Sequence, residues 1–295
     1  MKRSTQLKLL CAFLANNRLL VICSVLCMAM VITSCSKNST GNEPDGPREV
    51  FGFEVPSYGL FLSLSGDVNG LYFIDHDIAE AYKAGDGHTG VEEDGTGLTH
   101  SGAGKPIIGS NGFALHKIAL NGSGATLIGD PSGQAFTEGL AFDSQENVLY
   151  ATSNGFLHIR NPDTGETIET VLSPPDQPDI EGLAFDPQTR FLYGLARGYE
   201  QLPQFFRGLY RLNTDTSRDQ WAWEEIGDTG GLWTNAGLAF DTDRKILYAV
   251  GRMDDLGGLY RIDPETGNAS RAGAVRVDGT DFETAEGGLT WVPAE

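Results

Sequence analysis

Short apolar segments, bounded by Gly, Asn, Asp and Pro, run along the chain from about residue 57 to the C-terminus. The most regular is GLAF, which occurs in EGLAFD at 138–143 and 181–186 and in AGLAFD at 236–241. A second apolar segment follows each copy: VLYAT, FLYGLA or ILYAVG. Short segments of this kind between turn residues predict β-strands, whereas no stretch of useful length has a helical period.

The three copies share a fixed internal spacing, with ten residues from the Gly of GLAFD to the Leu of LY. A third segment such as GLYRID and a weaker fourth such as TIETVL complete each unit, with PDTG or PETG as hairpin turns. Asp143, Asp186 and Asp241 end the GLAF segments, and each is expected to open a turn by bonding nearby backbone N–H groups. Four short strands in roughly 40–50 residues are typical of a β-propeller blade. We therefore predict an all-β propeller of four-stranded blades.

The number of blades follows from the GL landmarks at 97, 139, 182, 237 and 288. They indicate five blades, or six if residues 76–96 contain a further strand pair. The C-terminal segment 286–295 (EGGLTWVPAE) has a first strand with nothing after it, whereas 59–75 has second and third strands with no first. The two halves predict a ring closed by pairing the C-terminal strand into the first blade, which removes exposed sheet edges.

The blades, written as G-L-A-x-D, L-Y-A and I-D-x-x-T-G, resemble bacterial secreted propeller repeats of the NHL and YVTN type over about residues 57–295. The resemblance implies the fold. It says little about activity, because propellers carry many unrelated functions.

The N-terminal segment reads as an export signal. Residues 1–34 contain Lys2, Arg3, Lys8 and Arg18, no acidic residue, and an apolar stretch of 13 residues that is short for a membrane span. The following ITSC resembles the bacterial lipobox, which implies a cleaved signal peptide at 1–34 and a lipidated Cys35. An uncleaved membrane anchor is the alternative. Residues 35–50 are expected to form a flexible tether and 51–295 the propeller domain. Ser36 follows Cys35, where an Asp would indicate retention in the inner membrane. By analogy with bacterial lipoproteins, we expect the protein at the outer membrane, facing the periplasm.

Composition narrows the function. All four cysteines (11, 23, 27 and 35) lie in the leader or at the lipidation site, which excludes a disulfide or a Cys nucleophile in the mature domain. Beyond the leader, 17 basic and 40 acidic residues give a net charge of −23. Such a surface disfavours nucleic acid and leaves the N-terminal lipid as the membrane contact. The expected partner is an envelope protein or a small-molecule ligand.

Propeller topology places the connections between second and third strands, and those leading to each next inner strand, on one face. The long, varied segments 197–208, 227–235 and 276–287 all belong to this set. Their aromatic side chains predict a ligand-binding face, or else a cover for the end of the propeller. The candidate ligand-binding residues are Tyr199, Phe205, Phe206 and Trp233.

Acidic and amide side chains precede several inner strands at the same face. Glu138 and Glu181 come directly before the Gly of GL, and Asn235 and Glu286 lie one residue earlier. Their oxygens suit Ca²⁺ or Mg²⁺. The pattern resembles gluconolactonase-like (regucalcin-like) propellers, which implies a calcium site at the channel mouth, although the one-residue offset departs from that family. Solvated or turn-bonded carboxylates are the alternative.

The histidines show no catalytic order: His116 and His158 align at or near the Tyr of LYRI, and His100 takes the position of Trp291. The sequence thus predicts an exported lipoprotein whose propeller binds a ligand or a protein. A metal-dependent hydrolase of the lactonase or phosphoesterase kind, using the channel-mouth carboxylates, and an envelope scaffold remain as alternatives.

Overall fold

The structure, a computed structural model, describes residues 49–50, 53–64, 70–85, 97–102, 105–130, 136–173, 177–198, 207–254, 256–282 and 287–294. The chain divides into two compact units, Met1–Gly46 and Pro47–Glu295, and the described residues all belong to the second. The predicted signal peptide, Cys35 and nearly all of the predicted tether lie outside the described residues and stay predictions. Within the described ranges, no helix is long and apolar enough to cross a membrane.

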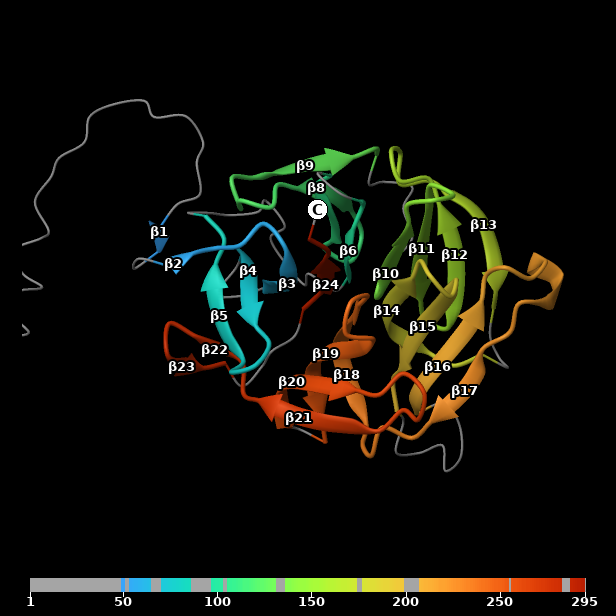
Figure 1. Cartoon of the computed structure of the whole chain (residues 1–295). Helices are drawn as coiled ribbons and strands as arrows, with labels where there is room; N and C mark the ends of the chain where they lie inside the picture. The colour runs from blue at the N-terminus through green and yellow to red at the C-terminus, as the bar shows by residue number, and fades with distance from the viewer. Residues whose placement is uncertain are drawn as a thin grey trace, which may run out of the picture. The chain divides into compact units, whose positions relative to one another are not determined.

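Five sheets form a ring (Figure 1), and four of them are blades of four strands in chain order, each antiparallel to the next. They are blade 2, with β6 (Gly97–His100), β7 (Ile107–Ser110), β8 (Leu115–Ile118) and β9 (Ala125–Ile128); blade 3, with β10 (Leu140–Asp143), β11 (Val148–Ser153), β12 (Phe156–Arg160) and β13 (Thr167–Leu172); blade 4, with β14 (Ile180–Asp186), β15 (Phe191–Ala196), β16 (Gly208–Asn213) and β17 (Glu224–Gly227); and blade 5, with β18 (Trp233–Asp241), β19 (Ile246–Met253), β20 (Leu256–Ile262) and β21 (Ala269–Gly273).

Blade 1 joins the two ends of this unit. It contains β3 (Gly59–Leu64), β4 (Gly70–Asp75) and β5 (Glu80–Lys83), and its inner strand is the C-terminal β24 (Leu289–Val292). β24 pairs antiparallel with β3, so that Leu289 lies opposite Leu62. The inner strands then contact one another in the order β6, β10, β14, β18, β24 and back to β6. The predicted five-bladed ring and its closure by the C-terminal strand are confirmed.

Blade 1 also has an outer addition. β22 (Arg276–Val277) pairs parallel with β5, and β23 (Thr280–Asp281) pairs antiparallel with β22, which extends this sheet to six strands. The backbone N–H of Arg276 donates to the carbonyl of Ala79 at 3.0 Å, and its side-chain Nε lies 3.1 Å from Glu80 Oε2. The sequence placed segment 276–287 on the ligand-binding face, but its strands β22 and β23 cover the outer edge of blade 1. The C-terminal part of the chain therefore holds β3–β5 from both sides.

The repeated GL motif brings the inner strands close together at the axis. A Cβ added to Gly182 would lie 2.8 Å from the carbonyl oxygen of Ala236 in blade 5, and one added to Gly288 would lie 2.6 Å from the amide nitrogen of Leu98 in blade 2. Real Cβ atoms do not approach backbone this closely, so these positions require glycine. The same approach recurs at all five landmarks around the ring: Gly97, Gly139, Gly182, Gly237 and Gly288.

Aromatic side chains fill the space between blades. Tyr193 of blade 4 stacks on Phe240 of blade 5, with ring centroids 5.5 Å apart. Tyr248 stacks in the same way on Trp291 of blade 1, and Tyr150 makes a tilted contact with Phe185 of blade 4. All three tyrosines are buried. Because each blade packs on its successor in this way, the core is a set of inter-blade clusters rather than one central core.

The residue after each GLAF segment opens a turn, as predicted. Asp143 Oδ1 accepts from the backbone N–H of Gln145 at 2.9 Å. Asp186 and Asp241 make the same bond two residues ahead, also at 2.9 Å, and all three carboxylates are buried. The turns that follow, 144–147, 187–190 and 242–245, are each four residues long.

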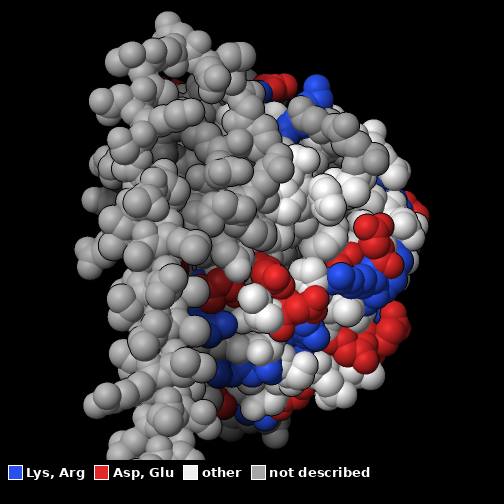
Figure 2. All heavy atoms as spheres, turned by 60° about the vertical axis from the view of Figure 1, so that its left-hand side comes forward, with Lys and Arg blue, Asp and Glu red and all other residues white. Residues whose placement is uncertain are grey.

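The short strands β1 (Glu49–Val50) and β2 (Phe53–Glu54) pair with each other ahead of blade 1. Figure 2 shows basic and acidic side chains interleaved on the described surface that comes forward in that view. Charge is therefore mixed on this side of the molecule, although the whole chain carries a net charge of −19.

Candidate functional site

The ring has two faces, which differ in their connections. We call the variable face the one that carries the links from second to third strands and from each outer strand to the next inner strand. The turn face carries the short links from first to second and from third to fourth strands. The candidate residues chosen from the sequence belong to the variable face, and both ends of the central channel are described below.

Glu181 lies at the variable-face end of the channel and is only 4% exposed. A register shift between Ile180 and Gly182 makes it an extra residue in β14. Its Oε2 accepts a hydrogen bond from the backbone N–H of Ala236 in the next blade at 3.2 Å, and its Oε1 lies 3.4 Å from Nη1 of Arg197. Glu181 therefore connects blades 4 and 5 at the axis.

Glu138 precedes the inner strand of the neighbouring blade 3 and is half-buried. Its Oε2 accepts from the backbone N–H of Asn154 at 2.7 Å. Burial raises the pKa of Glu138, and the nearby charge of Asp179 raises it further. Burial also raises the pKa of Glu181, to about 7, with smaller increases from the charges of Glu138 and Asp179 and opposing effects of Ala236 N–H and Arg197. The charges of these two predicted metal ligands therefore interact, and the charges of Asp179 and Arg197 act on both of them.

The other two predicted metal ligands do not join them in the described structure. Asn235 is exposed, with a φ of 52° in the irregular first part of β18. Glu286 lies outside the described residues. Within the described ranges, no three His, Cys, Asp or Glu side chains are grouped so that they could hold a metal ion. The calcium site stays a prediction that rests on Glu138 and Glu181.

Trp233 differs most from its expected place. The sequence predicts an aromatic contact for a ligand, but its side chain is 0% exposed. Its Nε1 donates to Thr229 Oγ1 at 2.8 Å, and its ring packs edge-on against Tyr260 with centroids 5.0 Å apart. Trp233 is a core residue, because its indole has both an apolar site and a hydrogen-bond acceptor in blade 5. Tyr199, Phe205 and Phe206 lie outside the described residues.

Exposed apolar side chains do occur on the variable face, at positions that the sequence did not single out. Phe113 is 63% exposed in the β7–β8 link, and Leu256 is 61% exposed at the start of β20. Phe156, at the start of β12, stacks on His158 and is 36% exposed. Phe113 also contacts Phe136, which lies in the link to blade 3. Their positions at the ends of the expected strands indicate this face. The sequence alone does not show whether an aromatic side chain there is exposed to solvent or covers the core.

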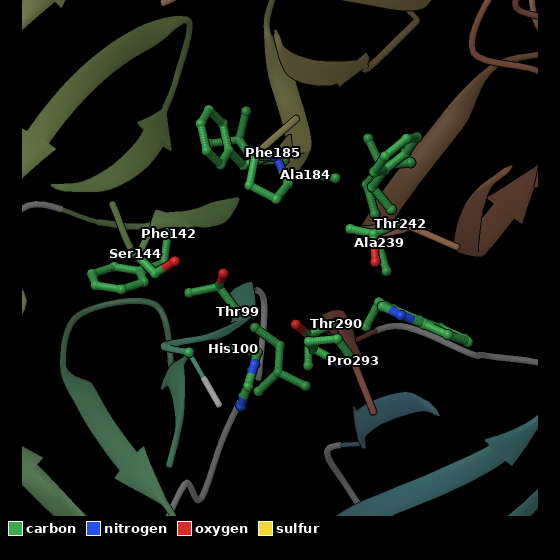
Figure 3. Close-up of a pocket in the computed structure, with 17 residues that line it drawn as sticks. Thr99, His100, Phe142, Ser144, Ala184, Phe185, Ala239, Thr242, Thr290 and Pro293 are labelled. Atoms are coloured by element: carbon green, nitrogen blue, oxygen red, sulfur yellow. The ribbon is translucent and has the colours of Figure 1, made fainter. Parts of the chain in front are cut away.

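The turn-face end of the channel contains an open cavity of about 170 Å³. The inner strand of every blade contributes to it, and Figure 3 shows Thr99, His100 and Thr290 on one side with Ala184 and Phe185 across from them. Ser144, Pro187 and Thr242, from the short turns, lie at its rim. This cavity is at the opposite end from the predicted site.

One ring of side chains forms the wall of this cavity. His100, Phe142, Phe185, Phe240 and Trp291 occupy the same repeat position in blades 2, 3, 4, 5 and 1. The preceding residue is Thr99 in blade 2, Thr290 in blade 1, and Ala in the three other blades. The alignment of His100 with Trp291 was visible in the sequence, but the cavity that they share was not.

The described lining of the cavity contains no Asp, Glu, Lys or Arg side chain. Burial lowers the pKa of His100, despite the opposing effect of a hydrogen bond to the backbone of Lys105, so its ring is neutral at pH 7. The carboxylates of Asp143 and Asp186 lie in the turns just outside and bond to backbone N–H groups there. The cavity is thus suited to uncharged groups.

Comparisons with known proteins agree on fold alone. No family model matches the chain, and no curated protein matches it. A solved structure titled as a nidogen/laminin complex is similar, with a TM-score of 0.55 and 13% identity over 80% of this chain and 99% of that chain. A structural genomics protein of unknown function from Bacteroides thetaiotaomicron also aligns, with a TM-score of 0.42 and 13% identity over 61% of this chain and 43% of that one. The first similarity confirms the propeller, and the identities are too low to transfer a function.

Proposed function

We propose that the chain is an exported lipoprotein, anchored through Cys35 to the outer membrane, whose propeller binds an envelope protein or a ligand at its variable face. The lipid supplies the membrane contact, and the acidic mature chain disfavours nucleic acid. Propellers commonly serve as binding modules, which gives this proposal its general basis.

The observation that carries the proposal is a set of three exposed apolar side chains on the variable face. Phe113 lies in the link between the second and third strands of blade 2, and Phe156 and Leu256 begin the third strands of blades 3 and 5. The corresponding link of blade 4 contains the predicted binding residues Tyr199, Phe205 and Phe206. Large apolar groups that project from several links of one face are typical of an interaction surface.

The binding test compares two sets of substitutions in the full-length lipoprotein. Phe113→Ser/Phe156→Ser/Leu256→Ser alters the variable face, and Leu127→Ser/Ile168→Ser alters exposed apolar residues on the outer strands β9 and β13. In-cell cross-linking followed by mass spectrometry should show a partner that is lost with the first set and kept with the second. Loss with both sets, or with neither, would rule out the variable face as the binding surface.

Lipidation has its own test. Mass spectrometry of the N-terminal peptide should show a diacylglyceryl-modified Cys35 as the first residue. In Cys35→Ala the mature protein should no longer fractionate with membranes. An unmodified Cys35 within an intact N-terminal segment would contradict the lipoprotein part of the proposal and leave the binding surface unaffected.

A metal-dependent hydrolase remains a second candidate, because Glu138 and Glu181 lie together at a channel mouth and both have raised pKa values. Calcium titration and metal analysis of the wild type and of Glu138→Gln/Glu181→Gln test it directly. Stoichiometric metal that is lost in the variant, together with hydrolysis of ester or lactone substrates, would support the enzyme. An envelope scaffold is the remaining alternative, and it predicts neither metal nor partner loss in these experiments.

A further inference from the structure

The turn-face cavity is asymmetric in its chemistry. The inner strands of blades 3, 4 and 5 carry the pair Ala–Phe, as Ala141–Phe142, Ala184–Phe185 and Ala239–Phe240, and all of these except Ala141 line the cavity. At the same two positions, blade 2 has Thr99–His100 and blade 1 has Thr290–Trp291. The inner strands of blades 1 and 2, β24 and β6, are in contact. All four departures from the repeat therefore gather on one side of the cavity.

The backbone of the repeat gives no reason for these four residues. The backbone pairing is the same in each case: Thr99 lies opposite Ile108 and Thr290 opposite Phe61, as Ala184 lies opposite Tyr193. Ala is buried at this position in three blades, and the Phe beside it packs against a Tyr of the preceding blade in two of them. Trp291 keeps this packing role, because it stacks on Tyr248, but the hydroxyls of Thr99 and Thr290 and the His100 ring have no counterpart in the other blades and point to a role other than packing.

Two ring nitrogens on this side lack a partner. His100 Nε2 and Trp291 Nε1 are buried, and neither has a hydrogen-bond partner among the described residues. A buried polar group that is left unpaired destabilises the protein. Thr99 and Thr290, which Figure 3 shows at the cavity, precede His100 and Trp291 in the same strands. Polar groups that converge in this way would be satisfied by hydroxyl groups of a bound molecule.

The opposite side of the cavity is apolar, formed by Phe142, Phe185 and Phe240 with Ala184 and Ala239. Its volume of about 170 Å³ is below the ~300–1,000 Å³ that drug-sized ligands occupy. A fitting molecule is one ring in size, has no charge, and has a polar edge and a C–H face. We propose that the turn-face cavity binds a single neutral sugar ring, with its hydroxyls toward Thr99, His100, Thr290 and Trp291 and its C–H groups toward the phenylalanines.

The test uses the full-length protein in a detergent without a sugar headgroup. The probes are methyl glycosides of neutral hexoses and 6-deoxyhexoses, with glucuronic acid and glucosamine as charged counterparts. Saturation-transfer NMR and titration should find saturable binding of at least one neutral probe and none of the charged ones. Absence of binding by every neutral probe, or equal binding of charged ones, would overturn the proposal.

The matched variant makes all blades alike: Thr99→Ala/His100→Phe/Thr290→Ala/Trp291→Phe. It should keep the wild-type melting temperature within a few degrees and bind the neutral probe about tenfold more weakly or worse, because several hydrogen bonds are lost. Leu127→Ser, on the outer strand β9, is the control and should bind normally. If the fourfold variant does not fold, Thr99→Val/Thr290→Val keeps the shape and removes only the hydroxyls. Unchanged affinity in a folded variant of either kind would show that the sugar does not bind in this cavity.

Discussion

The guanidinium of Arg190, in the first turn of blade 4, lies 2.6 Å (Nη1 to Oδ2) from the carboxylate of Asp143, which ends the inner strand of blade 3. Both side chains are buried. The two groups meet as an ion pair, without the angles of a linear hydrogen bond. Lys245 holds the same repeat position in blade 5, but its Nζ lies 3.8 Å from Asp186 and its side chain is half-exposed. Arg190 thus connects blades 3 and 4 from within, whereas Lys245 connects blades 4 and 5 from the surface.

This difference predicts unequal effects of two equivalent substitutions. Arg190→Met should lower the free energy of unfolding by about 3 kcal/mol, because it leaves the buried carboxylate of Asp143 without its cation. Lys245→Met should lower it by less than about 1 kcal/mol, as for an exposed pair. Urea unfolding at pH 7 measures both. Equal losses would mean that burial of the ion pair is irrelevant to its contribution.

Glu181 predicts a pH dependence of stability. Burial raises its pKa from the ordinary value of 4.5 to about 7, so the folded protein holds this proton more tightly than the unfolded chain does. The resulting stabilisation is present below about pH 4.5 and is lost as the pH rises through about 7, up to about 3 kcal/mol. Glu181→Gln keeps an oxygen for Ala236 N–H and cannot ionise. The difference in unfolding free energy between variant and wild type should therefore shift in favour of the variant between pH 5 and pH 8.

Glu138→Gln is the comparison for this measurement. Burial raises the pKa of Glu138 as well, but the side chain is only half-buried, so its pH-dependent difference should have the same sign and be smaller. A larger effect for Glu138 than for Glu181, or an effect of opposite sign, would contradict the assignment.

The glycines of the inner strands leave no room for a larger side chain, so substituting them should destabilise the fold. Gly182→Ala would place a Cβ 2.8 Å from the Ala236 carbonyl oxygen, and that backbone cannot yield without separating blades 4 and 5. We expect a loss of about 2 kcal/mol or more in unfolding free energy. Gly273→Ala is the control, since its Cβ would meet only the Ala79 side chain, at 3.2 Å. Thermal melts of the two variants should separate by several degrees, and similar melts would show that the axis is less crowded than these distances indicate.

Closure of the ring predicts that losing the pairing of β24 with β3 destabilises the protein more than losing the pairing of β22 with β5. Removing residues 286–295 deletes β24, exposes the edge of β3 and takes Leu289 out of the core, so cooperative unfolding should disappear. Arg276→Pro removes one N–H that donates to Ala79, at the outer edge, and should cost about 1 kcal/mol. Calorimetry distinguishes the two results. A truncated chain that melts like the full one would refute closure through β24.

Much of this fold was predictable because each copy of the sequence repeat corresponds to one blade. The spacing from Gly139 to Leu149 sets the first hairpin, and the unmatched halves at 59–75 and 286–295 indicate the closure. β22 escaped prediction because two residues in parallel pairing leave no periodic pattern. Trp233 was misplaced because an aromatic residue before a strand looks the same whether it faces solvent or the core.

The turn-face cavity was not predictable for a different reason. Its wall is one residue from each of five blades, and only the closed ring brings His100 next to the inner strand that carries Trp291. The sequence showed that these residues hold equivalent positions. It did not show that the space between them is left unfilled, because that depends on the geometry of all five inner strands at once.

Leu62 and Leu289 pair across 227 positions of the chain, and Ala79 bonds to Arg276 on the other side of the same sheet. During synthesis, β3, β4 and β5 are made before the strands of the other four blades. The strands that pair with their two outer edges, β24 with β3 and β22 with β5, are made after those blades. A ribosome or a translocation channel that still holds residues 276–292 therefore holds an open arc of blades with unpaired edges. The ring can close only once these residues have emerged, which makes β22 and β24 the timing element of folding and the unfinished arc the form on which any chaperone would act.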